Sequence, residues 1–258
     1  VTIPPAAVTG PVRVVASGAT ISGPSLTVLV SLRARVSVAP VAGATVEAFA
    51  VSGGVKGASL GTGLTDASGL ASLFFAGQPG YTGLVLVEAS DGSFADPRAG
   101  APTPVDGVLR SAANRAMAGA VPELAVTPLS TLAVAIAERH PSGLQGASLV
   151  DSRVAVAARI GGADPISTLP LDLSTTVSGA AGAVELAIFN AAFAELAAEL
   201  GASSVGDLVD RLASDLDDGR IDGHDALTSQ TLLPESAILA SLARRAAGLV
   251  DAGVFAPA

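Results

Sequence analysis

The sequence predicts an α+β protein, in which an N-terminal antiparallel β-sandwich precedes a C-terminal α-helical bundle. Apolar residues alternate with others along 28–38, which is the period of a half-buried strand. Further short strand-like segments follow at intervals of about 8–12 residues with turn residues between them. From Val126 the apolar period is that of a helix. We therefore expect an extended arm at 1–16, a sandwich at 17–100, a linker at 101–125 and an all-α domain at 126–258.

The sandwich is predicted from its strands and from the turns that separate them. In 28–38 the alternation places Arg33 and Arg35 on the solvent face. The segment Asp66-Ala-Ser-Gly69 is typical of a type I turn, because an Asp side chain can cap the turn and Gly can adopt a positive φ. Four more strands are expected at 44–51, 58–65, 69–75 and 84–89.

These strands carry three motifs in a fixed order. They are Pro40-Val-Ala-Gly-Ala-Thr-Val46, then Thr65-Asp-Ala-Ser-Gly69 and an aromatic-containing strand, then Tyr81-Thr-Gly-Leu-Val-Leu-Val-Glu88. In these motifs residues 38–96, about a quarter of the chain, resemble the carboxypeptidase regulatory-like (transthyretin-like, prealbumin-like) β-sandwich. The resemblance implies an immunoglobulin-like or transthyretin-like sandwich with a non-catalytic accessory or structural role. With the Ala-rich helical region behind it, the chain is similar to exported bacterial surface proteins.

The second half is expected to form a bundle of about five helices. Thr127-Pro128 has the pattern of an N-cap followed by Pro at the first helical position, and this helix should end at His140-Pro141. Gly201 should end an Ala-rich helix whose composition has the highest helix propensity. The four later helices are expected at 149–160, 181–200, 204–216 and 234–250.

The composition excludes several kinds of partner and site. The net charge is −9 and the pI is about 4.6, with no basic cluster, so neither nucleic acid nor an anionic membrane surface is an expected partner. All of the net acidity lies beyond residue 120, where seventeen acidic residues accompany seven basic ones. The absence of cysteine excludes disulfides and thiolate sites. No uninterrupted apolar run is long enough for a transmembrane helix.

The hydrophobicity of the chain favours a homo-oligomer. Half of the residues are apolar and 14% are charged, where about 25% is usual for a soluble monomer. Burial of surface between subunits would account for this excess, because large apolar patches mark interfaces. A codon bias toward Ala and Val is the alternative explanation.

The most chemically distinctive segment is Asp215-Leu-Asp-Asp-Gly-Arg-Ile-Asp-Gly-His-Asp225. An EF-hand register with Gly219 at its sixth position leaves Ser214 and Leu216 at ligand positions, so half of the calcium cage is missing. An acidic turn between two helices is therefore the favoured interpretation, and Ca²⁺ binding with altered geometry is the alternative. The candidate ligands are Asp215, Asp217, Asp218, Asp222 and Asp225.

No catalytic residues are predicted, and we expect a protein that is not an enzyme. Gly57-Ala-Ser-Leu-Gly61 matches the nucleophile-elbow pattern, but that pattern needs a strand before it and a helix after it, and here strands lie on both sides. The histidines, His140 and His224, are too few for a zinc site without other ligands. A role for His140 at a helix C-terminus is the favoured interpretation.

Together these features predict an exported structural protein that assembles with copies of itself on or outside a bacterial cell, as a filament or surface-layer subunit. The chain begins at Val1 rather than Met, which favours removal of a signal peptide, and a lipid anchor before this residue stays open. The expected coupling device is strand addition by the N-terminal arm. Its candidate assembly residues are Val1, Ile3, Val8, Val12, Val14 and Val15. A monomeric surface binding module or adhesin, with or without calcium, is the alternative.

Overall fold

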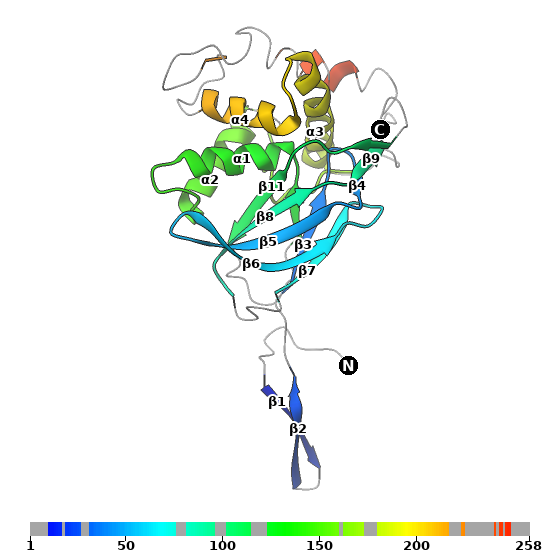
Figure 1. Ribbon diagram of the computed structural model, residues 1–258, viewed down its shortest axis with the longest axis vertical. Helices are drawn as coiled ribbons and strands as arrows, with labels where there is room; N and C mark the ends of the chain where they lie inside the picture. Colours follow the sequence, from blue (N-terminus) through cyan, green and yellow to red (C-terminus); the bar gives the residue numbers. More distant parts are fainter. Residues whose placement is uncertain are drawn as a thin grey trace.

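The structure of the protein is a computed structural model. The structure describes residues 10–16, 19–26, 31–75, 81–95, 102–114, 123–159, 162–172, 180–216, 223–224, 240, 243–244 and 246–248. It confirms a mixed α+β protein, with strands in the first half and helices in the second (Figure 1). No described helix is both long and apolar enough to cross a membrane.

Two sheets make up the larger part of the β region. The four-stranded sheet has the order β11 (Leu109–Asn114), β8 (Leu84–Ser90), β5 (Thr45–Ser52), β6 (Val55–Leu64), and all its pairs are antiparallel. The three-stranded sheet has the order β12 (Glu123–Val126), β3 (Ser31–Val36), β7 (Leu70–Phe74). The β12–β3 pair is parallel, which differs from the expected all-antiparallel arrangement. β12 comes long after β3 in the chain, so it can pair with β3 in either direction. No residue pattern near either strand specifies which direction is adopted.

The strands β5, β6, β7 and β8 confirm the four segments expected from alternation. In β3, Leu32, Ala34 and Val36 are buried and Arg33 is exposed, as the period of two requires. Arg35 is half-buried because its guanidinium pairs with Glu123 of β12, with an N–O distance of 2.7 Å.

The segment 101–125, expected to be a linker, instead contributes strands to the sheets. It contains β11, β12 and β10 (Pro102–Pro104), and β10 pairs with β9 (Ser93–Ala95), which in turn pairs with β4 (Val41–Ala42). Pro102 and Pro104 of this segment lie within β10 itself. β11 pairs with β8 over six residues, and this long-range pairing has no local sequence signal.

The Asp66–Gly69 turn joins β6 to β7 and has the predicted chemistry. The Asp66 carboxylate accepts hydrogen bonds from the Ser68 hydroxyl at 2.7 Å, the Ser68 N–H at 2.8 Å and the Leu70 N–H at 3.0 Å. Gly69 has a φ of 77°, in the left-handed region that favours glycine. The hydroxyl of Ser68 and then the N–H of Leu70 hold the pKa of Asp66 below its ordinary value of 3.8.

This lowered pKa predicts how the turn responds to acid. A carboxyl whose pKa is lower in the folded state stabilises that state above the unfolded pKa, and the contribution disappears as the pH falls through the folded pKa. Asp66→Asn, which mimics the protonated form, should therefore melt below the wild type at neutral pH. The gap in melting temperature should close at a pH below 3.8. A gap that stays constant across the acid titration would contradict the assignment.

The two larger sheets adjoin each other along β6 and β7. A Cβ atom built on Gly61 would overlap the carbonyl oxygen of Phe74, and one built on Gly63 would lie 2.9 Å from the carbonyl oxygen of Ser72. Glycine is thus required on β6 because the β7 backbone approaches it so closely.

The free edge of β11 is covered by helix α1 (Pro128–Arg139). The N–H of Arg110 donates to the Thr131 hydroxyl at 2.7 Å, and the carbonyl of the same residue accepts from the Ser130 hydroxyl at 2.7 Å. Both outward-facing backbone groups of this edge residue are therefore satisfied by the helix.

Helix α1 begins and ends as the sequence predicts. Thr127 is its N-cap in a capping box with Ser130, Pro128 is the first helical residue, and His140 is the C-cap. The buried amide of Asn190 adds a second cap, because its oxygen accepts the Leu129 N–H at 3.1 Å. The sequence gives no sign of that contact.

The other helices follow the expected segments. α2 (Gly146–Arg159) begins three residues before the expected start, and α3 (Ala181–Glu199) and α4 (Val205–Asp215) agree to within one residue at each end. Ser204 caps α4 by accepting the Asp207 N–H at 3.0 Å. Of the helix expected at 234–250, residues 240, 243–244 and 246–248 are helical, and the rest lies outside the described part of the chain.

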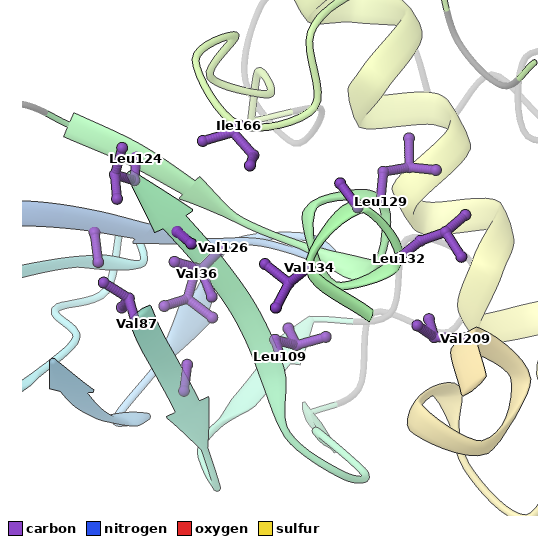
Figure 2. Packing of buried hydrophobic residues seen from close by; sticks show 14 of the residues in the cluster. Val36, Val87, Leu109, Leu124, Val126, Leu129, Leu132, Val134, Ile166 and Val209 are labelled. Carbon is purple, nitrogen blue, oxygen red and sulfur yellow. The ribbon is translucent and has the colours of Figure 1, made fainter. Parts of the chain in front are cut away.

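Sheets and helices share one hydrophobic core. The buried residues from Leu32 to Leu216 form one connected cluster. Figure 2 shows α1 at its centre, with Val134 toward Leu109 and Val126 of the sheets and Leu132 toward α3. The 17–100 and 126–258 segments, expected as separate domains, therefore bury their apolar surfaces against each other.

The N-terminal strands form a separate two-stranded sheet. β1 (Gly10–Ala16) and β2 (Ala19–Leu26) are antiparallel neighbours that pair with each other and with no other described strand. They extend away from the rest of the molecule (Figure 1). The segment 1–16, expected as an extended arm, is thus partly engaged in a hairpin, because its residues 10–16 pair with β2. A register shift lies between Pro11 and Arg13, where the missing proline N–H interrupts the ladder.

Candidate functional site

A charged cleft of about 600 Å³ lies where the four-stranded sheet meets α1 and α4. Its volume is in the range of small-molecule sites. The walls come from β8, β11 and the two helices, and more than half of the lining residues are charged. The lining residues are Glu88, Val108, Arg110, Thr131, Ala135, Glu138, Arg139, Gly206 and Asp210.

Arg110 is the central charge of this cleft. Its guanidinium lies 2.6 Å from the Glu138 carboxylate on α1 and 3.8 Å from the Asp210 carboxylate on α4. Its backbone is held by the α1 hydroxyls described above, so its position depends on the packing of α1 against β11. Arg110 thereby links the sheet to both helices.

Arg139 forms the second cationic wall of the cleft. It ends α1, where a cation is favoured by the helix dipole. Its guanidinium donates to the backbone carbonyl of Asp210 and to the Ser214 hydroxyl, both at 3.3 Å. These two bonds hold α4 against the end of α1.

Glu88 forms the opposite wall on β8 and is bound by a lysine from β6. The Lys56 ammonium lies 2.6 Å from the Glu88 carboxylate and 3.7 Å from the centre of the Phe49 ring. The lysine is thus held by an ion pair and a cation–π contact on the exposed face of the sheet.

The charged side chains of the cleft are engaged with groups of the protein itself. Arg110 is paired with Glu138 and Asp210, and Glu88 is paired with Lys56, so a ligand that binds these groups would have to replace existing ion pairs and would need charges of both signs. Ion pairs that are partly exposed contribute only about 0–1 kcal/mol each, so such a replacement is energetically accessible. Thr131 is the one hydroxyl residue in the lining, and it is already bonded to Arg110 and Thr127.

Of the five candidate calcium ligands in the acidic loop, Asp215 is the one that lies within the described residues. Asp215 is 1% exposed, and its carboxylate oxygens each lie 3.2 Å from the Gly223 N–H, which closes the loop after α4. Asp217, Asp218, Asp222 and Asp225 lie outside the described residues. Among the residues that are described, no group of three or more His, Asp or Glu side chains is arranged for a metal. Calcium binding by this loop remains a hypothesis.

Of the six candidate assembly residues, three lie within the described part of the chain and three lie outside it. Val12, Val14 and Val15 lie in β1, whereas Val1, Ile3 and Val8 precede the described residues. The register places Val14 opposite Ile21 and Val15 opposite Thr20.

Ser59 and His140, both considered in the sequence analysis, lie in different elements of the structure. Ser59 is exposed in the middle of β6, opposite Phe49, and no strand-to-helix turn surrounds it. His140 contacts Ser142 at 2.7 Å through its Nδ1 atom, within an exposed loop after α1. That short-range contact belongs to the C-terminal cap of the helix.

The sequence alone does not identify the charged cleft. Arg110 lies in the segment expected as a linker, and Glu138 and Asp210 lie on helices about 28 and 100 residues further along the chain. Charge on a predicted helix is a weak signal, because most such charges are solvated. Comparison of the chain with family models, curated proteins and solved structures finds no match.

Proposed function

We propose that this protein is a non-enzymatic, exported structural protein that self-assembles on or outside a bacterial cell. The observation that supports the proposal is the β1–β2 hairpin, which pairs with no other described strand and extends from the body (Figure 1). A two-stranded sheet alone is marginally stable in water, and a third strand or a covering element is needed for independent stability. Addition of a strand from another molecule would supply it.

In this proposal the remainder of the chain is a rigid body that carries the hairpin. We interpret the two adjoining sheets as a transthyretin-like sandwich of the carboxypeptidase regulatory-like type, and the helices as the bundle that follows it. The motifs at 40–46 and 65–69 support this interpretation, since the second of them forms the turn that such a sandwich would use. Because sheets and helices share one core, the body would hold the β1–β2 hairpin on a single folded unit.

The test is removal of the hairpin. A chain lacking residues 1–26 keeps every core residue among those whose burial the structure describes, the first of which is Leu32, so it should fold with an unchanged melting temperature. The full chain should sediment as assembled species and the shortened chain as a monomer. A shortened chain that still assembles would place the contact elsewhere, and a full chain that is monomeric at all concentrations would contradict self-assembly.

The charged cleft supports a second candidate function, a monomeric surface binding module or adhesin whose acidic loop binds calcium. In that case Ca²⁺ should raise the melting temperature, because a ligand that binds the folded state stabilises it. The rise should be lost in the double variant Asp217→Ala, Asp222→Ala and retained when the distant Asp151 of α2 is changed to Ala. Addition of Ca²⁺ without any rise would reject the calcium part of this alternative.

A further inference from the structure

We propose that β1 of one molecule pairs antiparallel with β1 of a second copy, giving a four-stranded sheet in the order β2–β1–β1–β2. This inference rests on the proposed self-assembly and specifies the surface that carries it. The two hairpins would be related by a two-fold axis, so that each copy presents the same strand to the other.

The first argument is that the other described sheets offer poor edges to an added strand. The outer side of β6 meets the β7 backbone at Gly61 and Gly63, and the β11 edge is bonded to the hydroxyls of α1. The β10 edge strand has Pro at both of its ends, and Pro cannot donate to a ladder. The β11 edge and the part of β6 around Gly61 and Gly63 are thus covered, and β10 is interrupted by proline, as is usual for edges that must not associate.

The second argument is the contrast between β1 and β2. β2 contains Gly23-Pro24, and this pair limits a continuous edge to the four residues from Ala19 to Ser22. β1 has its Pro at the second position and continues without Pro or Gly from Val12 to Ala16. It is therefore the longer uninterrupted edge in the hairpin. Its one charged residue, Arg13, is a weak deterrent to pairing.

The charge of Arg13 also restricts the register of the pair. Two like charges placed directly opposite each other in an antiparallel pair are destabilising. A two-fold axis at Val14 places Arg13 opposite Val15 of the second copy and Val12 opposite Ala16, so the two arginines are not opposed. This register uses the whole uninterrupted edge of β1.

Cysteine cross-linking of the full chain tests this pairing, because the protein contains no cysteine of its own. In Val14→Cys the two Cα atoms at the axis would be about 4.5–5.5 Å apart, which is within the range of a disulfide. Ile21→Cys is the matched control, since Ile21 lies opposite Val14 in the same hairpin. In the proposed sheet its two copies would be three strand spacings, about 14 Å, apart, which is too far for a disulfide.

The expected result is a disulfide-linked dimer for Val14→Cys that disappears on reduction, with little or none for Ile21→Cys. Equal or stronger cross-linking at Ile21 would overturn the β1 pairing. An assembled protein in which neither position cross-links would also overturn it, while leaving self-assembly intact. A full chain that sediments as a monomer would overturn both.

Discussion

Leu132→Ala is expected to lower the free energy of unfolding by about 2–5 kcal/mol, the usual cost of truncating a fully buried leucine. Leu132 is 0% exposed on α1, on the side toward α3 (Figure 2). The loss comes from the removed apolar contacts and from the cavity that the surrounding helices cannot fill.

The same variant tests whether sheets and helices unfold together. The chain has one tyrosine and no tryptophan, so Tyr81 fluorescence reports on the β region, where its hydroxyl donates to the Leu84 carbonyl at 2.7 Å and accepts the Val51 N–H at 3.1 Å. Far-ultraviolet circular dichroism reports mainly on the helices. Because one core joins the two regions, the urea midpoints from both probes should coincide in the wild type and move together in Leu132→Ala.

The control for this experiment is Val150→Ala on α2. Val150 is apolar and helical like Leu132, but it is 54% exposed, so its truncation should change the stability by less than about 0.5 kcal/mol. A tyrosine midpoint that stays at its wild-type value in Leu132→Ala would show that the β region folds as an independent domain.

Gly61→Ala is expected to destabilise the protein by about 1–3 kcal/mol, the typical cost of forcing extra atoms into a packed site. The added methyl group would overlap the Phe74 carbonyl oxygen and lie 3.1 Å from the carbonyl carbon. These are backbone atoms that cannot rotate away, so β7 would have to move from β6. Thermal or urea unfolding measures the effect.

Substitutions at two further glycines test whether the loss of stability depends on how closely the backbone approaches. At Gly63 the added Cβ would lie 2.9 Å from the Ser72 oxygen, so Gly63→Ala should cost less than Gly61→Ala. At Gly146, in the first turn of α2, nothing lies within 4 Å, and Gly146→Ala should be neutral or raise the stability by up to about 1 kcal/mol. Equal stabilities for the three variants would contradict the close approach of β6 and β7.

Local chemistry made parts of this fold predictable. Thr127 and Pro128 determine where α1 begins, because the cap bonds involve only the first turn. The Asp66–Gly69 turn follows from its own four residues. The alternation in β3 follows from burial of one of its faces, and that burial does not depend on which strands lie beside it.

The charged cleft was not predictable in the same way. Arg110 was expected in a linker, and its position depends on bonds that the hydroxyls of Ser130 and Thr131 make to the edge of β11. Ser130 has the sequence context of an ordinary capping box, and Thr131 that of the residue after it. Of the acidic loop, the part that the structure describes shows Asp215 as a buried acceptor for Gly223, and nothing in its sequence distinguishes that role from a metal ligand.

The sequence by itself determined the strands from β5 to β8, the four helices α1–α4, the caps of α1, the turn at Asp66 and the exclusion of thiol chemistry, since each depends on residue identity or on neighbours within a few positions. Tertiary structure decided which strands adjoin, that β11 and β12 join the sheets, and that sheets and helices share one core. It also decided that β1 enters a hairpin while α1 covers the edge of β11. Pairing partners far apart in sequence are selected by the total surface they bury together, and no short segment carries that information.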